Sequence, residues 1–216
     1  MFAALMVCGL MTTSCSKEET VIPIDNQGQD QGQKEDETPS IDAVSLQVKY
    51  EAQASQAVIE NYNLVGTAVL VRYIDSDGKI KSEPFTGKFT KEVTIPFTKN
   101  GVEAAFQVLL VLKNKEEIEF GEGVNVATEM NFTWAVNYSD KSQSEAIVFS
   151  TDNGFGNARP NLIESYYDNY VSHFGGFVPT MVHLGYYAEE VENHIKIEGP
   201  RLLAASFWRE HAYTGQ

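Results

Sequence analysis

Metal ligation is the first chemistry that the residue types suggest, because all four histidines lie in the C-terminal part of the chain. They are His173, His183, His194 and His211. Glu190 precedes His194 by four residues, a spacing that places two side chains on one face of a helix, where they could share a divalent cation. No H-E-x-x-H motif occurs, and no two histidines have ligand spacing on one helix. The pattern is more typical of an amphipathic helix with an acidic solvent face, so we expect no metal site.

Calcium ligation is the chemistry that Asp75-x-Asp77-Gly78 could carry, because calcium loops open with this pattern. An EF-hand also needs a Glu at the twelfth position of the loop, and the twelfth residue from Asp75 is Thr86. The segment therefore predicts a hairpin turn.

Nucleophilic and phosphate-binding chemistry has no motif in this chain. The sequence contains no G-x-S-x-G. The glycine pairs Gly121-Glu122-Gly123 and Gly154-Phe155-Gly156 lie outside a strand–loop–helix context, which favours ordinary loops. We predict no catalytic residue and no cofactor. The alternative is a hydrolase whose carboxylates come together only in the fold.

Stacking chemistry is suggested by a tract of aromatic residues late in the chain. Exposed aromatic rings bind sugars and are favoured at protein interfaces. The other explanation is that these rings pack helices against the rest of the protein. The candidate binding residues for a glycan or a protein are Tyr166, Tyr167, Tyr170, Tyr186 and Tyr187.

The thiol of Cys15 follows an apolar N-terminal run. Residues 2–11 are almost wholly apolar, about half of the roughly 20 residues that a membrane-spanning helix needs, and typical of a signal peptide. The residues before Cys15 resemble the bacterial lipobox, although Thr12 replaces the usual Leu and no Lys or Arg precedes the run. The resemblance implies that residues 1–14 are a signal peptide, and that Cys15 carries diacylglycerol and palmitate chains. Each buried CH₂ adds roughly 0.8 kcal/mol of membrane affinity. The alternative is an N-terminus that packs into the domain.

Residues 15–42 read as the lipidated Cys and a flexible acidic linker. The segment is rich in Gln, Gly, Asp, Glu and Lys and cannot bury enough apolar surface to fold. Its end-to-end distance is on the order of 30 Å. Lys17-Glu18-Glu19 resembles the surface-export signal of Bacteroidota lipoproteins, which implies attachment to the outer membrane with the protein facing the exterior.

The composition limits the partners and the chemistry. The formal net charge is −14, so a general nucleic-acid-binding surface is disfavoured. The chain has two Cys, and neither Cys8 nor Cys15 would remain as a free thiol in the mature protein. A domain without disulfides must be held together by its hydrophobic core, and this chain is long enough to form one.

Residues 43–152 show the period-two alternation of β-strands. Pro96 predicts an edge strand, and the run from Val102 to Leu112 is apolar on both faces, as in a central strand. Short strands with regular turns predict an antiparallel, Ig-like β-sandwich, so that the protein is mainly β. The expected strands are 67–73, 89–97, 102–112, 132–138 and 146–149.

Residues 153–216 change to a spacing of three and four, which predicts a helical C-terminal region and α+β overall. A first helix is expected from Asn161 to Gly175-Gly176. A second helix is expected after a Thr180 N-cap, and a short third helix from Leu202 to Trp208.

A family resemblance rests on the layout and on three segments, Tyr73–Gly78, Lys91–Phe97 and Phe106–Leu112. Together they look like a group of small uncharacterised Bacteroidales surface lipoproteins with a lipobox Cys, an acidic linker and a β-rich domain. The resemblance covers roughly residues 1–175. It implies a location at the cell surface and a β-rich fold, and it identifies no functional site.

The sequence therefore predicts a lipid-anchored outer-membrane protein with a non-catalytic binding or structural role toward a protein or a glycan. A surface hydrolase, or an accessory or inhibitor subunit of an outer-membrane complex, are the alternatives.

Overall fold

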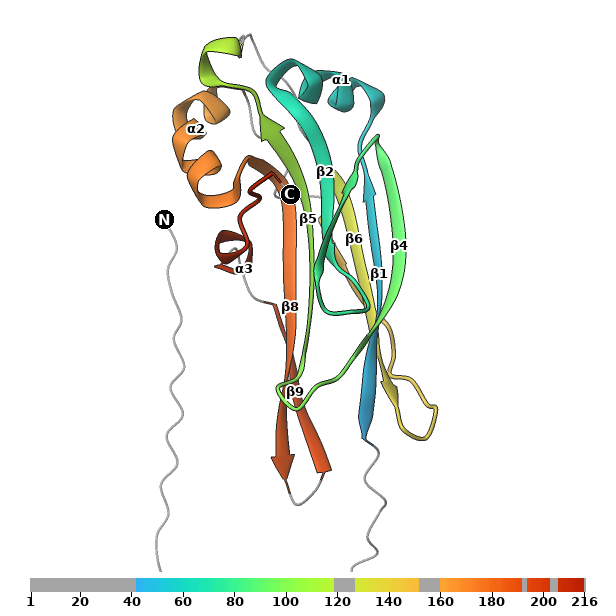
Figure 1. Cartoon of the computed structure of the whole chain (residues 1–216). Coiled ribbons are helices and arrows are strands. Elements are labelled where there is room, and N and C mark those ends of the chain that lie inside the picture. The colour runs from blue at the N-terminus through green and yellow to red at the C-terminus, as the bar shows by residue number, and fades with distance from the viewer. Residues whose placement is uncertain (1–41, 119–126, 152–159, 192–193, 203–205, 216) are drawn as a thin grey trace, which may run out of the picture. The chain divides into compact units, whose positions relative to one another are not determined.

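The computed structural model describes residues 42–118, 127–151, 160–191, 194–202 and 206–215 of the 216-residue chain. The expected signal peptide, Cys15 and the expected linker up to residue 41 lie outside these residues. The described chain forms two antiparallel β-sheets, three α-helices and one 3-10 turn, η1 (Lys115–Glu117) (Figure 1). The prediction of a mainly β protein is confirmed.

Sheet A contains four strands in the order β4-β1-β6-β7, and sheet B contains five strands in the order β3-β2-β5-β8-β9. The strands of sheet A are β1 (Ala43–Gln53), β4 (Lys88–Pro96), β6 (Glu129–Tyr138) and β7 (Ile147–Ser150). The strands of sheet B are β2 (Gly66–Ile74), β3 (Ile80–Pro84), β5 (Val102–Leu112), β8 (Phe177–Val191) and β9 (His194–Leu202). All the pairs in the described ladders are antiparallel.

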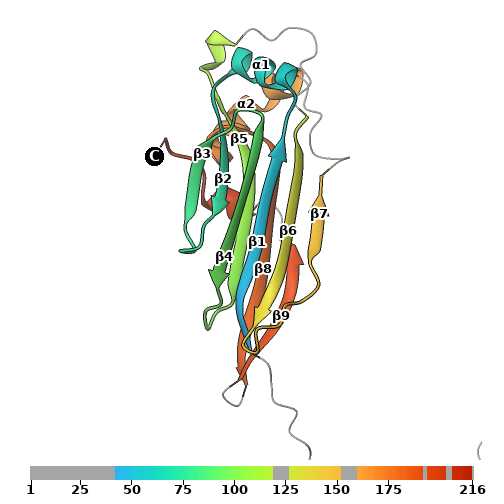
Figure 2. The same cartoon turned by 90° about the vertical axis from the view of Figure 1, so that its right-hand side faces the viewer.

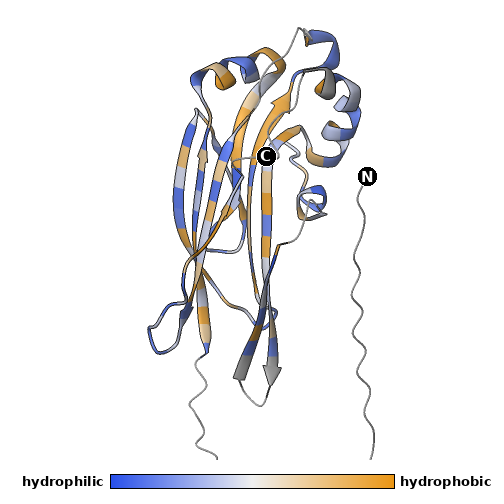
Figure 3. Ribbon diagram, turned by 180° about the vertical axis from the view of Figure 1, so that it is seen from behind, coloured by the Kyte–Doolittle hydropathy of each residue, from blue (hydrophilic) through white to orange (hydrophobic). Residues whose placement is uncertain are grey.

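The two sheets face each other across one hydrophobic core. The ring of Tyr50 in sheet A lies 5.4 Å from that of Tyr73 and 5.3 Å from that of Phe106, both in sheet B. Between the same sheets, Trp134 Nε1 donates a 3.0 Å hydrogen bond to the Tyr186 hydroxyl. Figure 3 shows hydrophobic and hydrophilic residues alternating along the strands, as expected when one face of each strand is buried. Each fully buried large side chain contributes roughly 1.5–3 kcal/mol.

The positions of two strands confirm expectations drawn from the sequence. β4, which ends at Pro96, is an edge strand of sheet A, and β5 is the central strand of sheet B. Pro cannot donate to a neighbouring strand, whereas β5 is apolar on both faces because both faces are covered.

The helix α1 (Gln56–Val65) connects β1 to β2 at one end of the sheets (Figure 1). Ser55 caps its start by accepting a 3.3 Å hydrogen bond from the N–H of Val58. Tyr62 anchors its buried face, and its hydroxyl lies 2.6 Å from Thr128 Oγ1.

The expectation of a helical C-terminal region is wrong for most of its length. The first expected helix is present as α2 (Pro160–Phe174), and part of the third as α3 (Ser206–Glu210). The second is absent: Thr180, its expected N-cap, lies inside β8, and β9 follows. The apolar residues of β8 fit a period of two as well as a period near 3.6. Pairing with β5, which would otherwise be an open edge, decides in favour of the strand.

The outer faces of the two sheets differ. Figure 2 looks onto sheet A, over which no described helix lies, whereas α2 and α3 lie beside β8 of sheet B (Figure 1). Phe207 and Trp208 of α3 are buried, and Trp208 Nε1 donates to the carbonyl of Val182 at 3.3 Å. No helix in the described ranges is both long and apolar enough to span a membrane.

Candidate functional site

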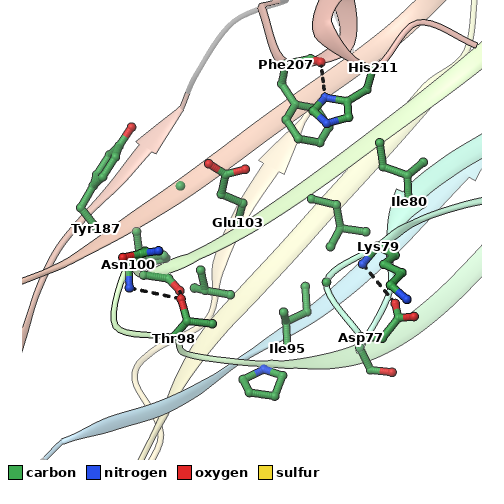
Figure 4. A pocket seen from close by; sticks show the side chains of 18 residues that line it. Asp77, Lys79, Ile80, Ile95, Thr98, Asn100, Glu103, Tyr187, Phe207 and His211 are labelled. Atoms are coloured by element: carbon green, nitrogen blue, oxygen red, sulfur yellow. Dashed lines mark hydrogen bonds between the residues drawn. The ribbon is translucent and has the colours of Figure 1, made fainter.

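A cleft of about 860 Å³ lies where β2 turns into β3 and where β4 leads into β5. This volume is within the roughly 300–1,000 Å³ typical of ligand sites. Figure 4 shows Phe207 and His211 on one side of the cleft and Asp77 and Lys79 on another. The residues that line it are Ile74, Ser76, Asp77, Gly78, Lys79, Ile80, Ile95, Pro96, Thr98, Asn100, Gly101, Val102, Glu103, Gly185, Tyr186, Tyr187, Phe207 and His211.

The cleft adjoins a stretch of β5 where its neighbour β2 stops early. The pairing of β2 with β5 ends where Tyr73 lies opposite Phe106, and an isolated bridge joins Thr98 to Gly101. Between these points, the segment Val102–Ala105 pairs with β8 on one side. No described strand pairs with its other side. We call this segment the β5 window.

The β2–β3 turn forms one wall of the cleft. Gly78 adopts a φ of 73°, which glycine tolerates at no steric cost, and its N–H donates to the carbonyl of Asp75 at 2.8 Å. The N–H of Lys79 donates to Asp77 Oδ1 at 3.1 Å, and Lys81 Nζ lies 3.5 Å from Oδ2. The Lys79 N–H, aided by the Lys81 charge, holds the pKa of Asp77 below its ordinary value, so its carboxylate stays ionised. The expectation of a hairpin turn here is confirmed.

The turn between β4 and β5 forms the opposite end of the opening. Thr98 and Gly101 exchange two backbone hydrogen bonds of 2.9 Å each. Gly101 has a φ of 102°, and a Cβ there would overlap the carbonyl oxygen of Tyr186, so only glycine fits. The tight turn places Asn100 at the rim of the cleft (Figure 4).

Glu103 is the carboxylate at the centre of the site. Odd-numbered residues of β5 point away from sheet A, because Phe106 points toward Tyr50 and side chains alternate along a strand. The Glu103 side chain is 53% exposed, and its Oε2 lies 3.4 Å from Nε2 of the buried His183. Burial lowers the pKa of His183 below its ordinary value of 6.5, against the raising effect of Glu103. His183 is therefore neutral at pH 7 and does not compensate the charge of Glu103.

A stack of three rings closes one side of the cleft. The ring of Phe207 lies 4.4 Å from that of His183 and 4.3 Å from that of His211. His211 Nδ1 lies 2.8 Å from the carbonyl of Phe207, which can only accept, so Nδ1 carries the proton that it donates. Because both faces of Phe207 are covered, this ring is not available for stacking on a ligand.

A buried arginine fixes the C-terminal segment that carries this stack. Arg72 of β2 donates from Nη1 to Gln107 Oε1 at 3.0 Å and from Nη2 to the carbonyl of His211 at 2.9 Å. Its guanidinium also lies 5.1 Å from the ring of Trp208 and 5.6 Å from that of Tyr213. The wall of the cleft thus depends on polar contacts made on the outer face of sheet B.

The structure does not bring the five candidate tyrosines together. Tyr166, Tyr167 and Tyr170 lie on α2, and Tyr186 and Tyr187 lie on β8. Tyr166 is 50% exposed, Tyr167 donates to the carbonyl of Lys113 at 2.6 Å, and Tyr170 packs on Phe177. Tyr186 is buried in the core, whereas Tyr187 is 42% exposed at the cleft.

The four histidines lie on different elements. His173 is on α2, His183 on β8, His194 on β9, and His211 follows α3. Glu190 and His194 belong to two paired strands and share no helix face. Within the described ranges, no group of three or more His, Cys, Asp or Glu residues could hold a metal ion.

The sequence analysis did not consider Glu103, Asn100 or Phe207 as site residues, and it considered His211 only as a possible metal ligand. For Glu103 a signal existed: it is the one charged residue within the run Val102–Leu112, where Gln107 is the only other polar residue. A charged residue in a central strand marks either a buried pair or a site.

Comparison of the chain with protein-family models, with curated proteins and with solved structures finds no match.

Proposed function

We propose that the protein is a lipid-anchored cell-surface protein with a non-catalytic binding role, and that its ligand occupies the cleft beside the β5 window. The observation that carries this proposal is the cleft itself, about 860 Å³ in volume, with the uncompensated carboxylate of Glu103 at its centre. Concave sites with a few convergent polar groups are the usual location of ligand binding.

The proposed location at the cell surface is supported by the N-terminal sequence. The apolar run of residues 2–11, Cys15 and the acidic Lys17-Glu18-Glu19 support a signal peptide, a lipid anchor and display on the outer membrane.

Binding is favoured over hydrolysis by the state of Asp77, a carboxylate of the cleft. A glycoside hydrolase needs one carboxyl group with a raised pKa to act as a general acid. Asp77 has the opposite shift, because its carboxylate accepts the Lys79 N–H and lies near Lys81. Asp77 is therefore suited to holding a turn or a cation and unsuited to protonating a leaving group.

An Ig-like topology is also proposed for the two sheets. The neighbours β3-β2-β5-β8 in sheet B correspond to C′-C-F-G of an Ig fold, and the pair β4-β1 in sheet A corresponds to E-B. The pair β6-β7 then occupies the side of strand B on which strand A lies.

The binding role is tested by screening the protein against peptide and glycan arrays and measuring the affinity of each hit. Glu103→Arg reverses the charge at the centre of the cleft and should weaken the binding of a basic ligand by about tenfold or more, because like charges placed together cost several kcal/mol and tenfold corresponds to about 1.4 kcal/mol. Glu92→Arg is the matched control, because Glu92 is an exposed carboxylate on β4 of sheet A. Binding that Glu103→Arg leaves unchanged, or substrate turnover that depends on Asp77 and Glu103, would refute the proposal.

The anchor is tested with Cys15→Ala. The variant should lose labelling by a palmitate analogue and move from the membrane fraction to the soluble fraction after a carbonate wash. A variant that stays in the membrane fraction would contradict the lipid anchor.

A further inference from the structure

The backbone of Glu103 points into the cleft. Thr98 and Gly101 exchange both of their backbone hydrogen bonds, so the N–H and C=O of Gly101 point away from β8. Along an antiparallel strand the N–H and C=O of every second residue point to the same side. No bulge interrupts β5 between Val102 and Val108, so Glu103 and Ala105 share the direction of Gly101. Ala105 is fully buried, which leaves Glu103 as the residue whose backbone faces the open space.

No strand among the residues that the structure describes fills this position. The carbonyl of Ile74, which would continue the ladder of β2, accepts a 2.8 Å hydrogen bond from the Tyr50 hydroxyl of sheet A. The turn from Asp75 to Lys79 then leads the chain away into β3. An unpaired strand edge bordered by a cleft is the arrangement to which an extended peptide can add as a further strand.

We propose that the ligand of the cleft is an extended peptide segment of a partner protein, which pairs with β5 at Glu103 as an added strand. This inference rests on the proposed function, because it assumes that the cleft is the binding site. The residue opposite Glu103 donates its N–H to the Glu103 carbonyl and accepts the Glu103 N–H.

The two faces of the opening define the side chains of this peptide. The residue opposite Glu103 points to the same face as the Glu103 carboxylate, so a Lys or Arg there forms a cross-strand ion pair. Its two neighbours point to the other face, toward sheet A, where Val102 and Ile95 are buried and apolar. The expected motif is therefore a basic residue between two β-branched apolar residues.

The aromatic rings of the cleft favour a peptide over a sugar. Both faces of Phe207 are covered by His183 and His211. The guanidinium of Arg201 lies 4.9 Å from the centre of the Tyr187 ring, so this ring also has one face occupied. Sugar recognition by stacking would thus depend on a single ring face, whereas strand addition uses the backbone of Glu103 directly.

The test uses the full chain extracted in detergent and the fluorescent probe peptide Thr-Val-Lys-Val-Thr, with binding followed by fluorescence anisotropy. A second probe carries an N-methyl group on the backbone amide nitrogen of the lysine, which removes the N–H that would donate to the Glu103 carbonyl. We expect the first probe to bind and the N-methyl probe to bind at least about tenfold more weakly, because an unpaired carbonyl is left in the cleft. In the Glu103→Arg protein, a Thr-Val-Glu-Val-Thr probe should bind better than the lysine probe, and Glu92→Arg should leave the original preference unchanged.

Several results would overturn the inference, and they separate it from the proposed function. Equal affinity for the N-methyl probe would rule out strand addition while leaving the cleft as a binding site. Binding of a glycan in place of the peptides, with an affinity that Glu103→Arg lowers, would also rule out strand addition and leave the cleft as a binding site. Peptide binding that is indifferent to Glu103→Arg would overturn both proposals. Self-association of the chain that Glu103→Arg abolishes would show that a second copy occupies the window. Because the N-methyl comparison uses the unmutated chain, it remains decisive if a variant fails to fold.

Discussion

The substitution Arg72→Met should undock the C-terminal segment and lower the free energy of unfolding. Arg72 is almost fully buried beneath this segment, and it connects Gln107 of β5 to the backbone of His211. Methionine keeps a long, flexible side chain in the same space but offers no donor. The wall formed by Phe207 and His211 would then lose its hydrogen bond to β2 and keep its apolar contacts and the hydrogen bond from Trp208 to Val182.

The size of the effect follows from three contributions. Two hydrogen bonds from a charged donor are lost, each worth about 1.5–3 kcal/mol. Gln107 Oε1 loses its partner, at a cost of about 1–3 kcal/mol. The variant no longer buries a guanidinium, so a desolvation penalty of several kcal/mol disappears and offsets part of this loss. We expect a net loss of about 2–4 kcal/mol, equivalent to a decrease of roughly 4–16 °C in Tm for a domain of this size.

Tryptophan fluorescence during urea unfolding provides the assay. The chain has two tryptophans, of which Trp134 lies in the core between the sheets and Trp208 lies beside Arg72. The variant should unfold at a lower urea concentration, and its emission in native buffer should shift to the red because Trp208 becomes hydrated.

The control for this prediction is Arg209→Met on the exposed side of α3, which should change stability by less than about 0.5 kcal/mol. Adding Gln107→Leu to Arg72→Met should restore about 1–2 kcal/mol, since no orphaned amide then remains. If Arg72→Met is as stable as the unmodified protein, the buried charge costs as much as its hydrogen bonds contribute, and the reasoning fails.

Three further predictions concern pH and glycine. The folded-state pKa of His183 lies below its ordinary value of 6.5, so the unfolded chain takes up a proton first and stability falls as the pH drops below 6.5. His183→Leu should flatten this decrease in urea midpoint; an unchanged slope would contradict it. Burial raises the pKa of Tyr62 from 10.0 to about 12, so stability is lost as the pH rises through this range, and Tyr62→Phe should reduce that loss in alkaline titrations followed by circular dichroism. Gly101→Ala, which would clash with Tyr186, should cost about 3 kcal/mol or more, whereas Gly78→Ala, with open space around it, should cost about 1 kcal/mol by thermal unfolding. Equal costs would show that φ alone determines the effect.

The period-two patterns of the sequence were sufficient to predict strands whose formation depends on short stretches of chain. β2 and β3 are joined by the turn that Asp75–Gly78 predicts, and Pro96 correctly marks β4 as an edge. The apolar run of β5 correctly indicates a central strand. These features depend on local turn chemistry and on burial of a whole strand, both of which are visible in the residues themselves.

The region of β8 shows where local pattern is insufficient. Met181, Leu184 and Ala188 fit a helical spacing, yet they lie in a strand that pairs with β5, which is far from them in the sequence. Only the global arrangement offers the open edge of β5 as a partner. The same holds for the outer face of sheet B, where Arg72, Gln107 and His183 become buried because α3 and the C-terminal residues cover them.

The sequence by itself determined the acidic character of the chain, the signal that predicts an anchor at Cys15, and the strands β2, β4, β5, β6 and β7. The tertiary structure alone decided that the pairing of β2 with β5 ends at Tyr73 and that Thr98, Glu103 and His211 surround one opening. The physical reason is that propensity and periodicity act over a few residues. A site assembled from two turns, two strands and a C-terminal helix depends on strand register, and that register is set by long-range pairing and by the packing of one sheet on the other.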